Sequence, residues 1–152
     1  MHFDTVLVTT DLSEDSFEAF DFAAYQAKTE NSRVVLLYTT NSWEIPPALA
    51  RHIPNSETLQ TYQDDLKVEL NDKLSVIAQE RFHGVKVDTM VVISSRPASE
   101  EIVSVADKIN ASLIVIASHG RGAVGQMFLG SVVDKVIKLA SCPVLVIPRK
   151  TN

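Results

Sequence analysis

Short runs of consecutive apolar residues alternate along the chain with longer stretches in which apolar residues recur every three or four positions. The short runs are rich in β-branched residues and are apolar at successive positions, a pattern typical of strands buried on both faces of a sheet. The sequence therefore predicts five strands. They span Thr5–Thr9, Val34–Tyr38, Val85–Ile93, Leu113–Ala117 and Val144–Ile147.

The stretches between these strands predict four amphipathic helices. Ser13 is a suitable N-cap for the first helix, and Pro97 suits the first turn of the third. The apolar positions of the first helix are Phe17, Phe20, Ala24 and Ala27, and those of the second are Leu59, Tyr62, Leu66, Leu70 and Ile77. Those of the third helix are Ile102, Val105, Ala106 and Ile109. Those of the fourth are Val132, Val133, Val136, Ile137 and Ala140. Strands that alternate with helices predict an α/β fold, a Rossmann-like three-layer sandwich around a five-stranded parallel sheet. The segment from Thr40 to Asn55 is expected to be irregular.

Composition and charge narrow the class of protein further. The 152 residues are 45% hydrophobic and 22% charged, as expected for one globular domain that spans residues 1–152. A net charge of -5 argues against nucleic acid as a partner. No apolar run approaches the roughly 18 residues of a membrane span. One cysteine, Cys142, cannot form an internal disulfide, so a cytoplasmic location is expected.

Four of the five glycines lie between residues 120 and 130, directly after the fourth predicted strand. Ligands of parallel sheets bind beyond the carboxyl ends of the strands, and glycine lets backbone N–H groups approach an anion closely. Ser131 adds a hydroxyl near the start of the last helix, where unpaired N–H groups favour anions, and Arg121 adds a cation. The segment therefore predicts a phosphate-binding cradle. A glycine-rich surface loop without a ligand is the alternative interpretation.

The spacing within this segment is more specific than its composition. Two residues separate Ala117 from Gly120, and nine separate Gly120 from the pair Gly130-Ser131. This spacing resembles the nucleotide-binding signature of the universal stress protein family, glycine, two residues, glycine, nine residues, glycine and then serine or threonine. The resemblance extends along the whole chain. It includes the segments Thr9–Glu14, Leu36–Tyr38, Pro97-Ala98 with Ile102, and Ser141–Pro148.

The resemblance implies the fold of adenine nucleotide alpha hydrolases and a regulatory protein of the stress response that binds ATP, ADP or AMP. Magnesium or manganese is expected with a triphosphate, which needs countercharge. The implied binding residues are Thr10, Asp11, Thr39, Ile116, Ala117, Gly120, Arg121, Gly130, Ser131 and Val132. Asp11 would face the adenine or the ribose, Thr39 would contact the adenine through its backbone, and Ile116 and Ala117 would flank the ribose.

Thr10 would lie beside Asp11, just beyond the first strand. The phosphates would be surrounded by the other five residues, which are Gly120, Arg121, Gly130, Ser131 and Val132. Two of the ten have plainer alternatives, because Asp11 also suits a helix cap and Arg121 also suits an exposed surface. Three positions depart from the family pattern. Ala117 replaces the first glycine of the signature, Ser95 replaces a glycine before the third helix, and Tyr38 replaces a histidine. Because the Ala117 methyl group would crowd the ribose or an α-phosphate, a dimeric scaffold of the same fold that binds no nucleotide is the alternative function.

The sequence identifies no catalytic residue and no metal site. The four histidines are scattered, and no partner that would orient His119 as a general base is recognisable. Gly-Lys-Ser and Gly-Lys-Thr are absent, so there is no P-loop. Slow hydrolysis of ATP by a bound water stays an open alternative, although no residue demands it.

The last predicted strand, Val144–Ile147, is expected at an edge of the sheet. A bare apolar edge invites pairing, and natural proteins cover such edges. A symmetric contact with a second copy of the chain would do so. The resemblance also implies a homodimer that forms through this strand.

Overall fold

The computed structural model describes residues 2–41, 56–118 and 129–148. Its centre is a sheet of five parallel strands in the order β3-β2-β1-β4-β5. The strands are β1 Thr5–Thr10, β2 Arg33–Asn41, β3 Val87–Ser94, β4 Leu113–Ala117 and β5 Val144–Ile147. The order reverses between the neighbours β1 and β4, as in doubly wound α/β folds.

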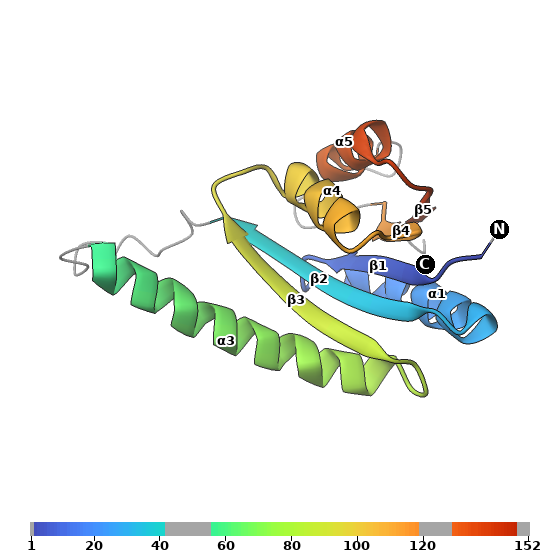
Figure 1. The fold of residues 1–152 in the computed structure, drawn as a ribbon, viewed down its shortest axis with the longest axis horizontal. Coiled ribbons are helices and arrows are strands. Elements are labelled where there is room, and N and C mark those ends of the chain that lie inside the picture. Colours follow the sequence, from blue (N-terminus) through green and yellow to red (C-terminus); the bar gives the residue numbers. More distant parts are fainter. Residues whose placement is uncertain (1, 42–55, 119–128, 149–152) are drawn as a thin grey trace.

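Four helices are described, and they cover the two faces of the sheet (Figure 1). They are α1 Glu14–Glu30, α3 Ser56–Arg81, α4 Ala98–Lys108 and α5 Ser131–Leu139. In Figure 1, α1 and α3 lie on one face, and α4 and α5 lie on the other. The predicted three-layer α/β sandwich with a five-stranded parallel sheet is confirmed.

Each face of the sheet has its own hydrophobic core, because successive strand residues point to opposite sides. In β1, Val6 and Val8 pack with the cluster that contains the α1 and α3 residues. Leu7 packs with the cluster that contains the α4 and α5 residues. All three side chains are fully buried. The consecutive apolar positions of the predicted strands are thus explained by burial on both faces.

The element boundaries agree with the prediction at β4 and β5 and differ by one to three residues at β1, β2 and β3. Strand β4 has the predicted limits, and so does β5. Strand β2 continues three residues beyond Tyr38 to Asn41, because pairing with β3 persists through the register Asn41↔Ser94. Thr40 and Asn41, which were expected to be irregular, therefore belong to the strand. Residues 42–55, the rest of the segment expected to be irregular, lie outside the described part of the chain.

The last helix buries only part of its apolar positions. Val133 and Val136 are buried, whereas Val132 is 36% exposed and Ile137 is 44% exposed. This nine-residue helix packs on α4 and on the edge strand β5, so only one narrow stripe of it meets the core. Val132 and Ile137 therefore belong to an apolar surface near the sheet edge.

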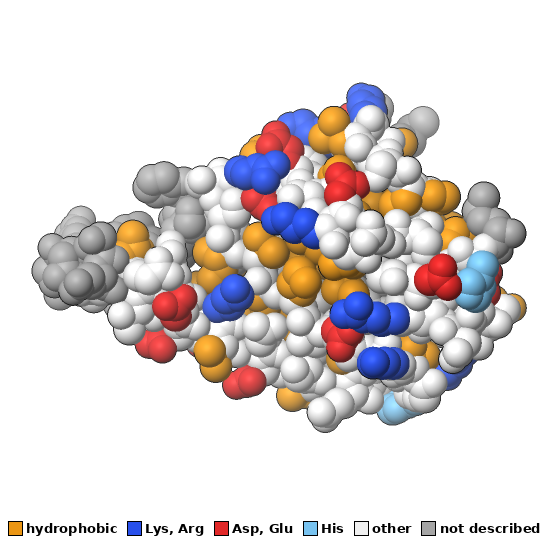
Figure 2. All heavy atoms as spheres, in the orientation of Figure 1, with side chains coloured by type: hydrophobic (Ala, Val, Ile, Leu, Met, Phe, Trp, Pro, Cys, Tyr) orange, Lys and Arg blue, Asp and Glu red, His pale blue; other side chains and the backbone are white. Residues whose placement is uncertain are grey.

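Strand β5 forms one edge of the described sheet, as predicted, and β3 forms the other. Leu145, in the middle of β5, is 38% exposed. No helix in the described part of the chain is both long and apolar enough to cross a membrane. On the face shown in Figure 2, acidic and basic side chains are interspersed, and no large patch of one sign is visible there.

Candidate functional site

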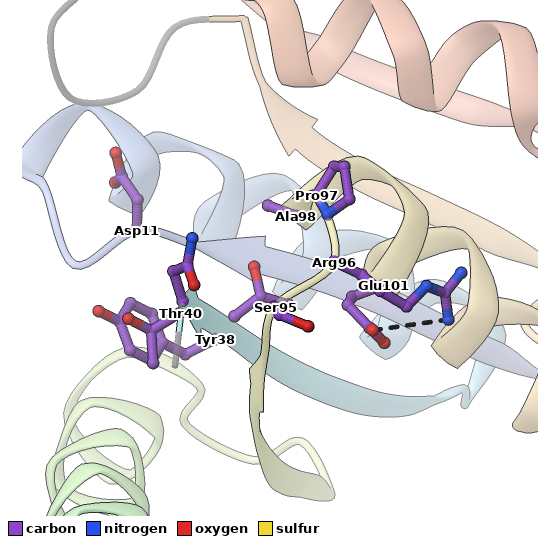
Figure 3. Close-up of a pocket in the computed structure, with 10 residues that line it drawn as sticks. Asp11, Tyr38, Thr40, Ser95, Arg96, Pro97, Ala98 and Glu101 are labelled. Carbon is purple, nitrogen blue, oxygen red and sulfur yellow. Dashed lines mark ion pairs between the residues drawn. The ribbon is translucent and has the colours of Figure 1, made fainter. Parts of the chain in front are cut away.

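A pocket of about 410 Å³ opens at the carboxyl ends of β1 and β2, beside the N-terminus of α4 (Figure 3). Pockets of this size and place are typical ligand sites of parallel α/β sheets. The described residues that line it are Asp11, Tyr38, Thr39, Thr40, Asn41, Ser95, Arg96, Pro97, Ala98 and Glu101. Two of the ten predicted binding residues, Asp11 and Thr39, belong to this set.

Asp11 is held in a fixed turn between β1 and α1. Its Oδ1 atom accepts hydrogen bonds from the Ser13 backbone N–H, at 3.0 Å, and from the Ser13 hydroxyl. Ser13 in turn caps α1 by accepting from the Ser16 N–H. Between them, Leu12 has a φ of 64°, a left-handed conformation that is uncommon for a bulky residue. The helix cap is therefore Ser13, as predicted, and Asp11 orders the turn from the pocket side.

Thr10 is buried and does not line the pocket. Its hydroxyl lies 2.7 Å from the Ser16 hydroxyl and also accepts a hydrogen bond from the Leu12 N–H. Thr10, which was predicted to bind the ligand, is therefore not among the described residues of the pocket wall. The Thr10 side chain stabilises the turn that positions Asp11.

Thr39 lies where β2 reaches the pocket, because this strand extends past the carboxyl end of β1. Its neighbours Tyr38 and Thr40 line the same pocket. Tyr38, which departs from the family pattern, is buried and packs with the core on the α1 side. Figure 3 shows Tyr38 and Thr40 close together below Asp11. Tyr38 and Thr40 are two residues apart in β2 and therefore share one face of the strand, so this segment gives the pocket both an aromatic and a polar group.

The turn between β3 and α4 supplies residues that sequence reasoning missed. The Ser94 hydroxyl donates to Glu101 Oε1 at 2.8 Å and accepts from the Arg96 backbone N–H at 3.0 Å. Arg96 Nη1 lies 3.5 Å from the same Glu101 oxygen, an ion pair drawn as a dashed line in Figure 3. Ser95, which replaces a glycine of the family pattern, lies in this turn and lines the pocket. The sequence feature that could have indicated this part of the site is the pair Ser94 and Ser95, two polar residues directly after the predicted strand Val85–Ile93.

The remaining described residues of the predicted set lie at the end of β4 and the start of α5. Ile116 and Ala117 are buried on opposite faces of the sheet, Ile116 toward α4 and α5 and Ala117 toward α1. Gly130 is the N-cap of α5, and Ser131 and Val132 are its first two residues. None of these five lines the pocket. Gly120, Arg121 and the rejected base His119 lie outside the described residues.

The described residues that line the site include charges of both signs. Asp11 and Glu101 are acidic and Arg96 is basic. Among the described residues, no group of three or more His, Cys, Asp or Glu side chains could hold a metal ion. Cys142 lies away from the pocket, half-buried against the core under α4 and α5. Burial, and secondarily the charge of Asp107, raises the pKa of its thiol above the ordinary value.

A doubly wound parallel sheet with a pocket at its carboxyl edge defines a class of ligand-binding α/β proteins. Within that class, the model of the universal stress protein family matches residues 2–148. Universal stress protein MJ0531 of Methanocaldococcus jannaschii is 33% identical over 147 residues, which cover 95% of this chain and 81% of that protein. Universal stress protein YxiE of Bacillus subtilis is 32% identical over 152 residues, covering 95% and 99%. The chain belongs to the universal stress protein family.

Solved structures share this fold over nearly the whole chain. The structure of protein MJ0577 of Methanocaldococcus jannaschii has a TM-score of 0.78 and 28% identity, and it covers 100% of both chains. A universal stress protein in complex with cAMP has a TM-score of 0.64 and 22% identity, covering 99% and 100%. The Archaeoglobus fulgidus universal stress protein in complex with dAMP has a TM-score of 0.62 and 22% identity, covering 97% and 99%.

Proposed function

We propose that this protein binds an adenine nucleotide at the carboxyl edge of its sheet and acts as a dimeric regulatory protein of the stress response. The observation that carries the proposal is the pocket that joins Asp11 to Thr39. Both were expected near the adenine and the ribose, and they come from separate segments of the chain. The pocket volume of about 410 Å³ lies in the range of small-molecule sites.

The orientation of the pocket supports a nucleotide that extends from β2 toward α5. Asp11 follows β1, and β1 pairs with β4, whose carboxyl end leads to the glycine segment. A base and ribose in the pocket would direct the phosphates toward the N-terminus of α5, where Ser131 and Val132 present the first amides of the helix. The cAMP and dAMP complexes of proteins with this fold are consistent with an adenine nucleotide. The predicted cradle of Gly120, Arg121, Gly130 and Ser131 is part of this proposal, with magnesium or manganese as countercharge.

The second candidate function is a scaffold of the same fold that binds no nucleotide. Ala117 favours it, because this residue stands where the nucleotide-binding signature has a glycine. In this case the dimer contact through β5, with the exposed Leu145 at its centre, would carry the function without a ligand. A cytoplasmic location and a single domain over residues 1–152 are common to both candidates and stay predictions.

Isothermal titration calorimetry with ATP, ADP and AMP, with and without magnesium, distinguishes the two candidates. We expect wild type to bind at least one of these nucleotides with a dissociation constant below about 1 mM. Asp11→Asn should weaken binding about tenfold, because a hydrogen bond to a charged group is lost. Asp21→Asn is the matched control, since Asp21 is exposed on α1 and does not line the pocket. Absence of binding by wild type at millimolar nucleotide would support the scaffold.

A further inference from the structure

Glu101 is a carboxylate in the wall of the pocket, and it is only 8% exposed. It lies in the first turns of α4, between the core and the pocket. Buried carboxylates are rare unless they are paired or hydrogen-bonded. The partners of the Glu101 carboxylate therefore determine whether its burial is compensated.

Both side-chain contacts of the carboxylate within the described part of the chain involve one of its two oxygens, Oε1. Oε1 accepts the 2.8 Å hydrogen bond from the Ser94 hydroxyl and lies 3.5 Å from Arg96 Nη1. Within the described residues, Oε2 has neither a hydrogen bond nor an ion pair. A carboxylate offers about four acceptor sites, so half of this one lacks a partner in the described part of the chain. A buried acceptor without a partner is costly and requires an explanation.

The neighbouring cation, Arg96, does not supply a partner for Oε2 of Glu101. The Arg96 guanidinium is shared with Glu100, whose Oε2 lies 3.4 Å from both the Nε and the Nη2 atoms. Arg96 is also half exposed, so its pairing with Glu101 is screened by solvent. The contacts with Ser94 and Arg96 fix the carboxylate in place and leave an acceptor available at the pocket wall.

We propose that Glu101 is a specificity-determining residue that accepts a hydrogen bond, at its free oxygen, from a donor group of the bound ligand. This inference rests on the proposed nucleotide function, because it concerns the same pocket. A nucleotide carries two kinds of donor that fit, the exocyclic amino group of the base and a hydroxyl of the ribose. A carboxylate accepts from either and cannot donate, so the pocket selects ligands that bear the donor.

The experiment compares AMP with three analogues by calorimetry. Inosine monophosphate has a carbonyl oxygen in place of the amino group, and 2′-deoxy-AMP and 3′-deoxy-AMP each lack one hydroxyl. We expect wild type to bind AMP about tenfold more tightly than the analogue that lacks the donor read by Glu101. The analogue that is discriminated identifies the source of the donor.

Glu101→Gln tests whether this residue causes the discrimination. Its amide can donate as well as accept, so the preference for AMP should fall to about twofold or less. Glu100→Gln is the matched control, because Glu100 is the preceding residue, pairs with the same Arg96 and does not line the pocket. It should keep the wild-type preference. Thermal melting shows whether each variant folds.

The outcomes separate the inference from the function on which it rests. Wild type that binds no nucleotide overturns the proposed function and this inference with it. Wild type that binds AMP and all three analogues equally well overturns the inference alone, without any variant. Wild-type discrimination that persists unchanged in a folded Glu101→Gln protein also overturns it. Loss of discrimination in Glu101→Gln but not in Glu100→Gln supports it.

Discussion

The backbone N–H of Gly130 donates a 3.0 Å hydrogen bond to the carbonyl oxygen of Ser118. This bond joins the end of β4 to the N-cap of α5, so the two ends of the glycine segment meet. The Gly130 N–H is thereby engaged within the protein. The donors that α5 can offer to a phosphate are the amides of its first turn, which begins at Ser131.

Gly130→Val should weaken ATP binding about tenfold while the fold persists. Gly130 has a φ of -59°, which any residue adopts, so the substitution adds no backbone strain. We expect the free energy of unfolding to fall by about 1 kcal/mol, because valine is a poor N-cap. The added side chain would obstruct the proposed phosphate position. Calorimetry measures the affinity, and an unchanged affinity in the folded variant would rule out a cradle at this position.

Ala117→Gly restores the first glycine of the family signature and tests whether the alanine methyl obstructs the ligand. Ala117 is 8% exposed and packs with the core on the α1 side. We therefore expect nucleotide affinity to change by less than about threefold, and the free energy of unfolding to fall by about 1 kcal/mol. Calorimetry and urea denaturation provide the two values. A clear gain in affinity would show that the methyl does crowd the ribose or α-phosphate, as the sequence suggested.

Leu145→Lys should convert the proposed dimer to a monomer. Leu145 is 38% exposed on the edge strand β5, and Val132 and Ile137 of α5 are exposed as well. A charge in the middle of an apolar edge blocks strand pairing. Analytical ultracentrifugation measures the mass in solution. Val68→Lys is the matched control, since Val68 is 62% exposed on α3. A dimer that survives Leu145→Lys would exclude the contact through β5.

Gly84→Ala should lower the free energy of unfolding by about 1–2 kcal/mol. Gly84 has a φ of 71°, and among the described residues an added Cβ would meet only Cε of Lys28, 4.0 Å away. The expected cost is therefore conformational and not steric. Gly84→Asn should cost less, because asparagine tolerates the left-handed region better than alanine. Chemical denaturation of both variants tests this order, and equal losses would contradict it.

Cys142 should react with iodoacetamide several-fold more slowly at pH 8 than a free cysteine does. Burial raises the pKa of this thiol, so it stays protonated at a pH where an exposed thiol begins to ionise, and only the thiolate is nucleophilic. The rate should rise at a higher pH than for a free thiol. Asp107→Asn removes the second cause of the shift and should accelerate the reaction. Mass spectrometry of the modified protein gives the rates, and a rate equal to that of free cysteine would contradict the prediction.

Much of the fold followed from local patterns. The consecutive apolar runs identified every described strand, and for β4 and β5 they also gave the limits. Ser13 was recognisable as the N-cap of α1 from its residue type and position. The limits of β2 were less accurate, because Thr39, Thr40 and Asn41 are polar and are kept in the strand by pairing with β3. No pattern within a single segment reveals such a partner.

In the candidate site, too, some residues were predictable from the sequence and others depend on contacts between distant segments. The family resemblance predicted Asp11 and Thr39 as binding residues, and both line the pocket. The sequence did not predict Arg96 and Glu101 as site residues, because a charged residue in a turn or on a helix is usually solvated. Only the juxtaposition of the β3–α4 turn with the end of β2 makes Glu101 a buried acceptor in a pocket.

By itself, the sequence determined the alternation of strands and helices, the parallel sheet buried on both faces, and the family. These depend on apolar periodicity and residue spacing, which are local properties of the chain. The tertiary structure alone decided the strand order, the identity of β3 as the opposite edge strand, and which polar residues share the pocket with Asp11. These features depend on contacts between segments that are distant in the sequence, such as the hydrogen bond between Gly130 and Ser118. Such contacts contribute to the stability of the fold only when the helices and strands pack together.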